Sequence, residues 1–154
     1  MQKITTFLTF NNQAEEAAQL YTSLFPESKI TRMTHYTAGT YMPAGSVMTV
    51  EFELAGQKYV ALNGGPYFTF STGISLSVSC ADQAEIDALW DKLTANGGAP
   101  GDCGWLKDRF GVSWQITPAN MFQLLGSADP AQRQRKMAAM MQMQKIDMAA
   151  IENA

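Results

Sequence analysis

Asn12-Gln13-Ala14-Glu15 returns almost unchanged as Asp82-Gln83-Ala84-Glu85 in the second half of the chain. Each copy follows a short run of alternating apolar residues and opens a stretch with the apolar period of a helix. A strand followed by a helix that occurs twice in so short a chain indicates an internal duplication. The two copies therefore predict two related modules that build one site between them.

The first copy predicts a module of strand, helix and three further strands. Asn12 and Glu15 form the pattern of a capping box, and Pro26 ends the helix that follows. The expected apolar stripe of this helix consists of Ala14, Ala17, Ala18, Tyr21, Leu24 and Phe25. Strands are expected over residues 4–10, 29–37, 47–54 and 58–63.

The second copy predicts the same plan with shorter middle strands. Residues 74–80 alternate as a strand, and Asp82 is expected to cap a helix that Asn96-Gly97-Gly98 closes. A short strand around 103–107 and a last strand over 112–117 complete the module. A helical segment then begins at Asp129-Pro130, with methionines at helical spacing.

The prediction is an α+β fold in which two βαβββ modules form a curved mixed sheet with a concave cleft. The expected boundaries are module one at about 1–63, a connection at 64–73, module two at about 74–126 and C-terminal helices at 127–154. At 154 residues the chain is expected to form a single domain.

The composition excludes several classes of partner. The net charge of −3 comes without a basic stripe, which disfavours nucleic acid as a partner. No apolar run approaches the roughly eighteen residues of a membrane span, and the N-terminus lacks the pattern of a secretory signal. Cys80 and Cys103 are too few for a disulfide framework. We therefore expect a cytoplasmic protein.

The face of the predicted sheet opposite the helices carries polar and aromatic side chains. If the sheet is flat these side chains face water, and if it curls they line a cleft of the kind that binds small molecules. The expected ligand-binding residues are Thr9, Asn63, Ser77, Ser79 and Gln115 for hydrogen bonds and Phe7, Tyr59 and Trp105 for walls.

Two further residues are weak catalytic candidates. His35 is the only histidine, and it fits either a surface position on a strand or a role as general base or ligand. Glu51 fits either a solvated strand or the concave face, where burial would raise the pKa of its carboxyl group.

Several motifs resemble the PhnB-like, or 3-demethylubiquinone methyltransferase-like, branch of the vicinal oxygen chelate superfamily. They are Phe7-Leu8-Thr9-Phe10, Ala14-Glu15-Glu16-Ala17, Tyr21 with Leu24-Phe25-Pro26, Ala61-Leu62-Asn63-Gly64-Gly65-Pro66, Cys103-Gly104-Trp105-Leu106-Lys107-Asp108 and Phe110-Gly111-Val112-Ser113-Trp114-Gln115-Ile116. The resemblance covers nearly the whole chain, including its methionine-rich end. It implies the paired-module fold, a curled sheet and a homodimer.

The resemblance also implies four metal-ligand positions, two in each module. In this sequence they fall near Phe7, at Ala61 or Asn63, near Ser77 and at Gln115. These side chains are a poor donor set for Zn²⁺, Ni²⁺ or Fe²⁺, which favour imidazole, thiolate or carboxylate. We therefore expect no metal and no cofactor, and Gly64-Gly65 lacks the context of a nucleotide-binding loop.

Three hypotheses follow, and the sequence does not decide whether the protein is an enzyme. The favoured one is a metal-independent protein that binds a small organic molecule in the cleft, as a homodimer. The alternative is a metal-dependent lyase, isomerase or dioxygenase with unusual ligands such as Glu51, His35 or Gln115. In the third, the methionine-rich helix is an interaction surface and no ligand is bound.

Overall fold

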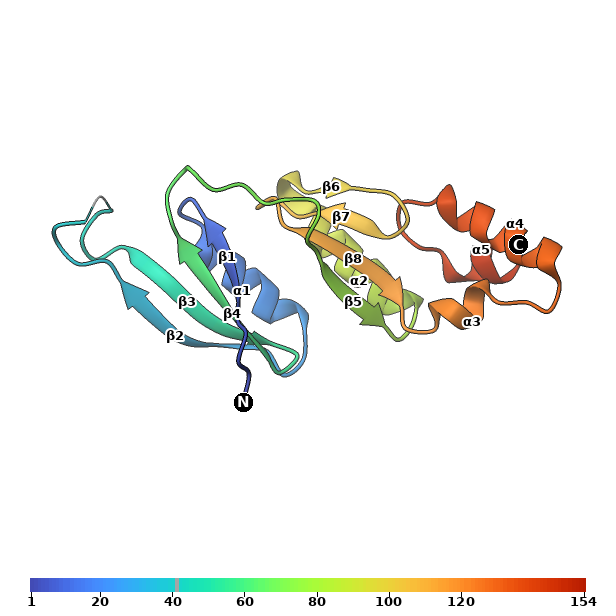
Figure 1. Ribbon diagram of the computed structural model, residues 1–154, viewed down its shortest axis with the longest axis horizontal. Helices are drawn as coiled ribbons and strands as arrows, with labels where there is room; N and C mark the ends of the chain where they lie inside the picture. Colours follow the sequence, from blue (N-terminus) through green and yellow to red (C-terminus); the bar gives the residue numbers. More distant parts are fainter. Residues whose placement is uncertain (41) are drawn as a thin grey trace. The chain divides into compact units, whose positions relative to one another are not determined.

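Each copy of the repeated motif opens the helix of a separate unit. The computed structural model, which describes residues 1–40 and 42–154, divides into unit 1, Met1–Thr69, and unit 2, Phe70–Ala154 (Figure 1). Both units run in the order strand, helix, strand, strand, strand, apart from a short 3-10 turn after the second helix. The predicted α+β class and the duplicated βαβββ plan are confirmed.

Unit 1 contains one helix against a four-stranded sheet. Its elements are β1 (Thr6–Phe10), α1 (Ala14–Leu24), β2 (Lys29–His35), β3 (Val47–Leu54) and β4 (Gln57–Asn63). The strand order is β1-β4-β3-β2, with β1 parallel to β4 and the other pairs antiparallel. The strands predicted for the first module are therefore present, with ends shifted by a few residues.

Unit 2 repeats this topology on shorter strands and adds three helices. Its elements are β5 (Leu76–Cys80), α2 (Gln83–Thr94), the 3-10 turn η1 (Ala95–Gly97), β6 (Ala99–Pro100), β7 (Trp105–Lys107), β8 (Ser113–Pro118), α3 (Met121–Leu125), α4 (Pro130–Met141) and α5 (Met148–Glu152). The order β5-β8-β7-β6 matches that of unit 1, again with the first and last strands parallel. The two-residue β6 was not predicted, because two residues are too few to show alternation.

The core of each unit lies between its helix and one face of its sheet. In unit 1 the buried alanines of α1 let the helix approach the sheet closely, and Tyr21 packs against Phe52 with 6.4 Å between ring centroids. In unit 2 larger residues of α2 fill this space. The buried positions there are Ile86, Leu89, Trp90 and Leu93 on the helix and Leu106, Trp114 and Ile116 on the sheet.

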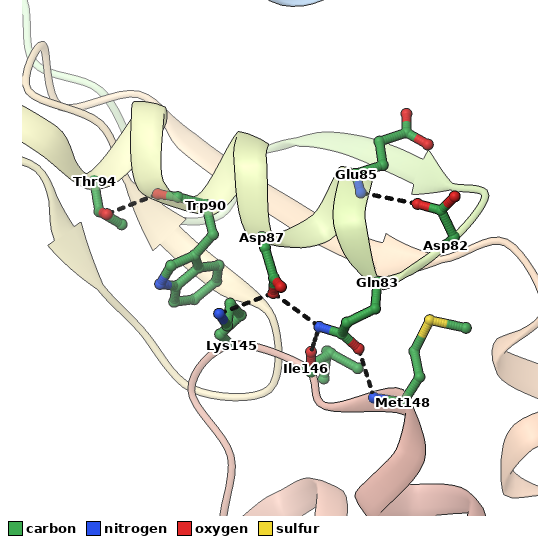
Figure 2. A network of polar contacts seen from close by, with 9 residues as sticks. All are labelled: Asp82, Gln83, Glu85, Asp87, Trp90, Thr94, Lys145, Ile146 and Met148. Carbon is green, nitrogen blue, oxygen red and sulfur yellow. Dashed lines mark hydrogen bonds and ion pairs between the residues drawn. The ribbon is translucent and has the colours of Figure 1, made fainter.

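The repeated motif caps the second helix but not the first. Asp82 accepts a hydrogen bond from Glu85 N at 2.9 Å and so caps α2 as predicted (Figure 2). The Glu85 carboxylate accepts a further bond from Ala81 N at 2.8 Å, one residue before the cap. The α1 helix instead begins at Ala14, and Gln13 at its N-cap makes no side-chain capping bond. The predicted cap at Asn12 is therefore wrong.

Asn63, at the end of β4, replaces the missing cap. Its Oδ1 accepts a hydrogen bond from Ala14 N at 2.9 Å, and its amide donates to Val47 O at 3.0 Å. Asn63 reaches the helix because β1 and β4 are parallel neighbours, so Phe10 and Asn63 end side by side where α1 begins. A long-range contact thus does the work that the local motif was expected to do.

Three short helices follow β8, and main-chain atoms, one ion pair and a small core attach them to the rest of unit 2. The Gln83 side chain donates to Ile146 O at 2.9 Å and accepts from Met148 N at 2.8 Å, while Lys145 lies 2.8 Å from Asp87 (Figure 2). In the turn before β7, Cys103 N and Gly104 N donate to the carbonyl groups of residues 143 and 144, both at 2.8 Å. A small core of Leu124, Ile146 and Ile151 completes the attachment.

The expected methionine stripe is divided between packing and exposure. The α4 helix ends at Met141, because residues 143 and 144 leave the helix and bond to the turn before β7. Met140, Met143 and Met148 pack against the small core, whereas Met137 and Met141 are exposed. Lys136, on α4, is buried and donates to Gly126 O at 3.2 Å.

The longest helices among residues 1–40 and 42–154 have twelve residues. A membrane-spanning helix needs about 20 predominantly apolar residues, so none of these helices is able to cross a bilayer.

Replacement of Asn63 tests the long-range cap. Asn63→Ala leaves Ala14 N–H and Val47 C=O without these partners, and we expect a loss of about 2 kcal/mol in the free energy of unfolding, measured by urea denaturation. Asn12→Ala is the matched control and should change stability by less than about 0.5 kcal/mol. If Asn12→Ala lowered the free energy of unfolding more than Asn63→Ala does, the result would show that Asn12 caps α1 after all.

The attachment of the C-terminal helices should depend on pH. The ion pair and the Gln83 hydrogen bond lower the pKa of Asp87 below its ordinary 3.8, and the bond to Asp87 raises the pKa of Lys145 above 10.5. The contribution of Asp87 is therefore present above about pH 4 and is lost as the pH falls through its lowered pKa. The contribution of Lys145 is present below about pH 10 and is lost at higher pH.

Hydrogen exchange at Met148 N–H, which donates to Gln83, measures this dependence. Asp87→Asn should reduce protection of this amide at pH 7 but leave it close to that of the unmodified protein once the pH has fallen below the lowered pKa of Asp87. Ala14 N–H in unit 1 is the control and should be equally protected in both proteins. An Asp87→Asn difference that does not shrink as the pH falls would contradict the assignment.

Candidate functional site

The face of each sheet opposite α1 or α2 is where the site was expected, and we call it the open face. Directly paired residues share a face, so the register assigns its members. The open face of unit 1 carries Phe7, Thr9, Thr49, Glu51, Glu53, Lys58, Val60 and Leu62. The open face of unit 2 carries Ser77, Ser79, Trp105, Lys107, Ser113, Gln115 and Thr117.

A hollow of about 410 Å³ lies on the open face of unit 1. Phe7 supplies an apolar surface there, because 56% of the residue is exposed although it belongs to a strand. Polar groups surround the ring. Besides Phe7, the hollow is lined by Thr5, Thr31, Glu51, Phe52, Glu53, Lys58, Tyr59 and Val60.

Thr9 lies at the other end of the open face of unit 1, where the chain leaves β4. A Cβ atom on Gly64 would lie 2.7 Å from Thr9 Cγ2 and 2.9 Å from the ring of Phe68. Only glycine leaves room for this approach, so the Phe68 ring reaches the same space as the Thr9 methyl group. The surroundings of Thr9 are therefore partly aromatic.

Two of the expected binding residues of unit 1 lie on the opposite face. Asn63 pairs with Phe10 and is buried beside α1, with both ends of its amide already bonded. Tyr59 pairs with Phe52, and their rings stack at 5.6 Å, although Tyr59 still borders the hollow. Burial raises the pKa of the Tyr59 hydroxyl above its ordinary value. Both were expected on the same face as Phe7. In the register Phe7 pairs with Val60, so Tyr59 and Asn63, at odd spacing from Val60 on β4, lie on the other face.

The two catalytic candidates of unit 1, His35 and Glu51, are not cross-strand partners. Glu51 lies on the open face, where its side chain is 40% exposed and its Oε2 is 3.6 Å from Arg32 Nε. His35 is exposed at the end of β2 and pairs with Val47 across the strand, whereas Glu51 pairs with Arg32. Glu51 is therefore the better placed of the two for contact with a molecule in the hollow.

The four candidates of unit 2 share one face, as expected. Ser77 pairs with Gln115, and Gln115 pairs in turn with Trp105, so these three form one row across the sheet. Ser79 is next to them on β5, opposite Thr117. The amide of Gln115 donates to Ser75 Oγ at 2.9 Å, which fixes the orientation of its side chain.

Sequence reasoning missed several residues that border the open faces. Lys107 follows Trp105 by two positions, so the alternation of a strand would have placed it on the same face. Val60 and Lys58 could have been found only from the pairing of β4 with β1 and β3, because β4 is apolar on both faces.

The buried carboxylate of Asp108 holds the turn between β7 and β8. Asp108 is 3% exposed, and its oxygens accept hydrogen bonds from Phe110 N at 2.9 Å, Val112 N at 3.0 Å and Trp114 Nε1 at 2.9 Å. Such a carboxylate is a structural group, because its oxygens are occupied by N–H donors. It thereby fixes the strands that present Trp105 and Gln115.

The metal-ligand positions implied by the resemblance are Phe7, Ala61 or Asn63, Ser77 and Gln115. Ser77 pairs with Gln115 across the sheet, whereas Ala61 and Asn63 lie on the face opposite Phe7. An aromatic ring, a methyl group or an amide that is already bonded, a hydroxyl and a neutral amide do not fit the preferences of Zn²⁺, Ni²⁺ or Fe²⁺. In the part of the chain that the structure describes, no group of three or more His, Cys, Asp or Glu side chains is arranged to hold a metal ion.

The chain is similar to proteins of one family. Residues 2–117 match the family model described as 3-demethylubiquinone-9 3-methyltransferase. The structure is similar to that of a PhnB protein from Bacillus cereus that is named after the same methyltransferase, with 39% sequence identity and a TM-score of 0.70 over 77% of this chain and 100% of that chain. No protein with a curated description matches.

A second solved structure, of a protein from Pseudomonas aeruginosa, has the same fold. It is 22% identical, with a TM-score of 0.62 over 77% of this chain and 98% of that chain. The family model ends at residue 117, so it does not cover the methionine-rich end, whose resemblance stays an expectation. The helices α3, α4 and α5 lie beyond it.

Replacement of Asp108 tests its structural role. Asp108→Asn puts an NH₂ group among N–H donors, and we expect a loss of about 2 kcal/mol in the free energy of unfolding by urea denaturation. Asp102→Asn, an exposed change in the preceding turn, is the control and should be nearly neutral. Equal stability of the two variants would show that the charge of Asp108 is not needed for the turn.

Proposed function

Since the chain belongs to the 3-demethylubiquinone-9 3-methyltransferase family, in its PhnB-like branch with the vicinal oxygen chelate fold, we propose that it binds a small organic molecule without a divalent metal. The observation that carries this proposal is the composition of the two open faces. Each combines an exposed aromatic ring, Phe7 or Trp105, with several hydroxyl and amide groups. Such mixed surfaces, when hollowed, are typical of ligand sites.

The proposed roles follow from the register. Phe7 and Trp105 supply apolar walls, while Thr9, Ser77, Ser79 and Gln115 supply hydrogen bonds. Asn63 is left out of this set, because its amide already bonds to Ala14 and Val47. Glu51 adds a carboxylate beside the hollow of unit 1.

The fold does not fit the methyl donor that the family description implies. A cofactor that contains adenosine is usually bound at the carboxyl ends of the strands of a parallel, doubly wound sheet, next to a glycine-rich turn. Both sheets of this protein mix parallel and antiparallel pairs, and the sequence has no glycine-rich turn between a strand and a helix. The family description therefore does not assign methyl transfer to this chain.

A homodimer in the cytoplasm belongs to the same proposal. The superfamily resemblance supports the dimer, and the composition supports the compartment. Size-exclusion chromatography with light scattering should give about twice the chain mass of 16.9 kDa. Deletion of residues 127–154 would show whether α4 and α5 are needed for that state.

Native mass spectrometry of untagged protein, from cells grown with ample trace metals, tests the ligand. We expect an organic adduct and no stoichiometric divalent ion. The adduct should be lost when Phe7 and Trp105 are both replaced by alanine and kept in Phe122→Ala, which truncates an exposed ring on α3. A tightly bound ion that disappears in Glu51→Gln, His35→Gln or Gln115→Ala would overturn the metal-free proposal and favour the lyase, isomerase or dioxygenase alternative.

A second measurement covers the case of an adduct lost during purification. Titration of ¹⁵N-labelled protein with a panel of one- and two-ring organic compounds should shift amide signals on the open faces. If no compound shifts these signals, the protein does not bind small molecules there and the proposal fails.

A further inference from the structure

A hollow of about 300 Å³ lies within unit 2, around the β6–β7 hairpin. Its lining includes Trp105 and Lys107 from β7, Ser113 from β8, Pro100 from β6 and Thr72 from the segment before β5. The volume is at the lower end for small-molecule sites, so a ligand of one or two rings is the size that it accommodates.

The hairpin holds Trp105 in a fixed position. Trp105 N donates to Asp102 O at 3.0 Å, and Trp105 O accepts from Gly101 N at 2.8 Å. A Cβ atom on Gly101 would lie 2.8 Å from Trp105 O, so only glycine allows this approach. Trp105 as a residue is nevertheless 38% exposed, so it remains available for contact. An exposed aromatic ring carried on a main chain that is held in place is a suitable platform for a planar ligand.

The charge around this hollow has one sign. Lys107 follows Trp105 on the same face of the sheet, and Ser113 pairs with it across the strand. None of the described residues that line the hollow is acidic. The adjacent carboxylate of Asp108 is buried and accepts bonds from Val112 N and Trp114 Nε1. Asp102, in the turn of the hairpin, does not line the hollow.

The neutral polar groups of the hollow also favour an anionic ligand. The hydroxyl groups of Thr72 and Ser113 are able to donate to an anion. Both residues line the hollow, and Ser113 pairs with Lys107 in the register. The unit 1 hollow differs, because Glu51 and Glu53 line it together with Lys58. An anion is therefore better accommodated in unit 2.

We propose that this hollow selects planar aromatic carboxylates of one or two rings. The ring stacks on Trp105, the carboxylate pairs with Lys107, and Thr72 and Ser113 donate at its edge. This inference rests on the proposed function and adds the chemical class of the ligand.

Isothermal titration with 2-naphthoate, 2-naphthamide and cyclohexanecarboxylate tests the class, since these probes separate charge from planarity. The naphthoate should bind most tightly, with the amide and the non-planar acid each weaker by about tenfold. Added salt should lower the affinity for 2-naphthoate but not that for 2-naphthamide, which carries no charge. Ring stacking should also quench the fluorescence of Trp105, because Trp90 and Trp114 are buried.

Variants assign the two contacts. Lys107→Met should weaken naphthoate about fivefold or more, and Lys107→Arg should retain most of the affinity. Trp105→Leu should weaken it by about tenfold. Lys92→Met, on the exposed side of α2, and Phe122→Leu, on α3, are the matched controls and should bind as the unmodified protein does. Circular dichroism checks that each variant is folded.

Equal affinity for naphthoate and naphthamide, unchanged affinity in Lys107→Met, or no binding of naphthoate at about 10 mM would each overturn the inference. If other compounds of the panel still shift amide signals on the open faces, the proposed function stands and only the ligand class fails. If none does, both fail.

Discussion

A single helix covers only one face of a four-stranded sheet, and each unit of this protein is built under that constraint. The alanines of α1 and the larger residues of α2 bury one face of each sheet. Burial of this apolar surface is the main favourable term in folding. The cost is a second face that the helix leaves to solvent, and the candidate binding residues lie on that face.

The order of strands adds a second consequence. Because the first and last strands of each unit are parallel neighbours, the start of the helix lies beside the end of the last strand. In unit 1 this neighbour supplies Asn63 as a cap. In unit 2 the motif caps its own helix, and Gln83 is left to bind the C-terminal helices. The duplicated motif has therefore acquired different contacts in its two copies.

The sequence predicted the class, the duplication and most strands, because alternation and apolar period are local properties. It also placed Ser77, Ser79 and Gln115 on one face, since β5 and β8 alternate clearly, and it named Trp105 on β7 as a wall of the same site. It failed for Asn63 because a capping rule reads only neighbouring residues, whereas the partner of Ala14 is far away in the chain. It failed for the face of Tyr59 because β4 is apolar on both sides, so only its register with β1 decides.

This chain keeps the fold of its family but lacks side chains that suit a divalent metal at the implied ligand positions. The family model matches residues 2–117, yet the implied ligand positions at Phe7, at Ala61 or Asn63, at Ser77 and at Gln115 offer poor donors. Fold and chemistry thus follow different constraints, since packing preserves the sheets whereas a few exposed positions set what they bind.

The attachment of the C-terminal helices has an evolutionary consequence. Gln83 contacts the carbonyl of Ile146 and the amide of Met148, and the turn before β7 contacts two more carbonyl groups. Every residue carries a carbonyl group, and every residue except proline carries an amide hydrogen. The main-chain contacts therefore constrain the sequence of this segment little. Its side chains are constrained where they form the ion pair with Asp87 or the small core, so substitutions are tolerated best at exposed positions such as Met137 and Met141. The segment thus carries a surface that is able to change while its attachment is kept.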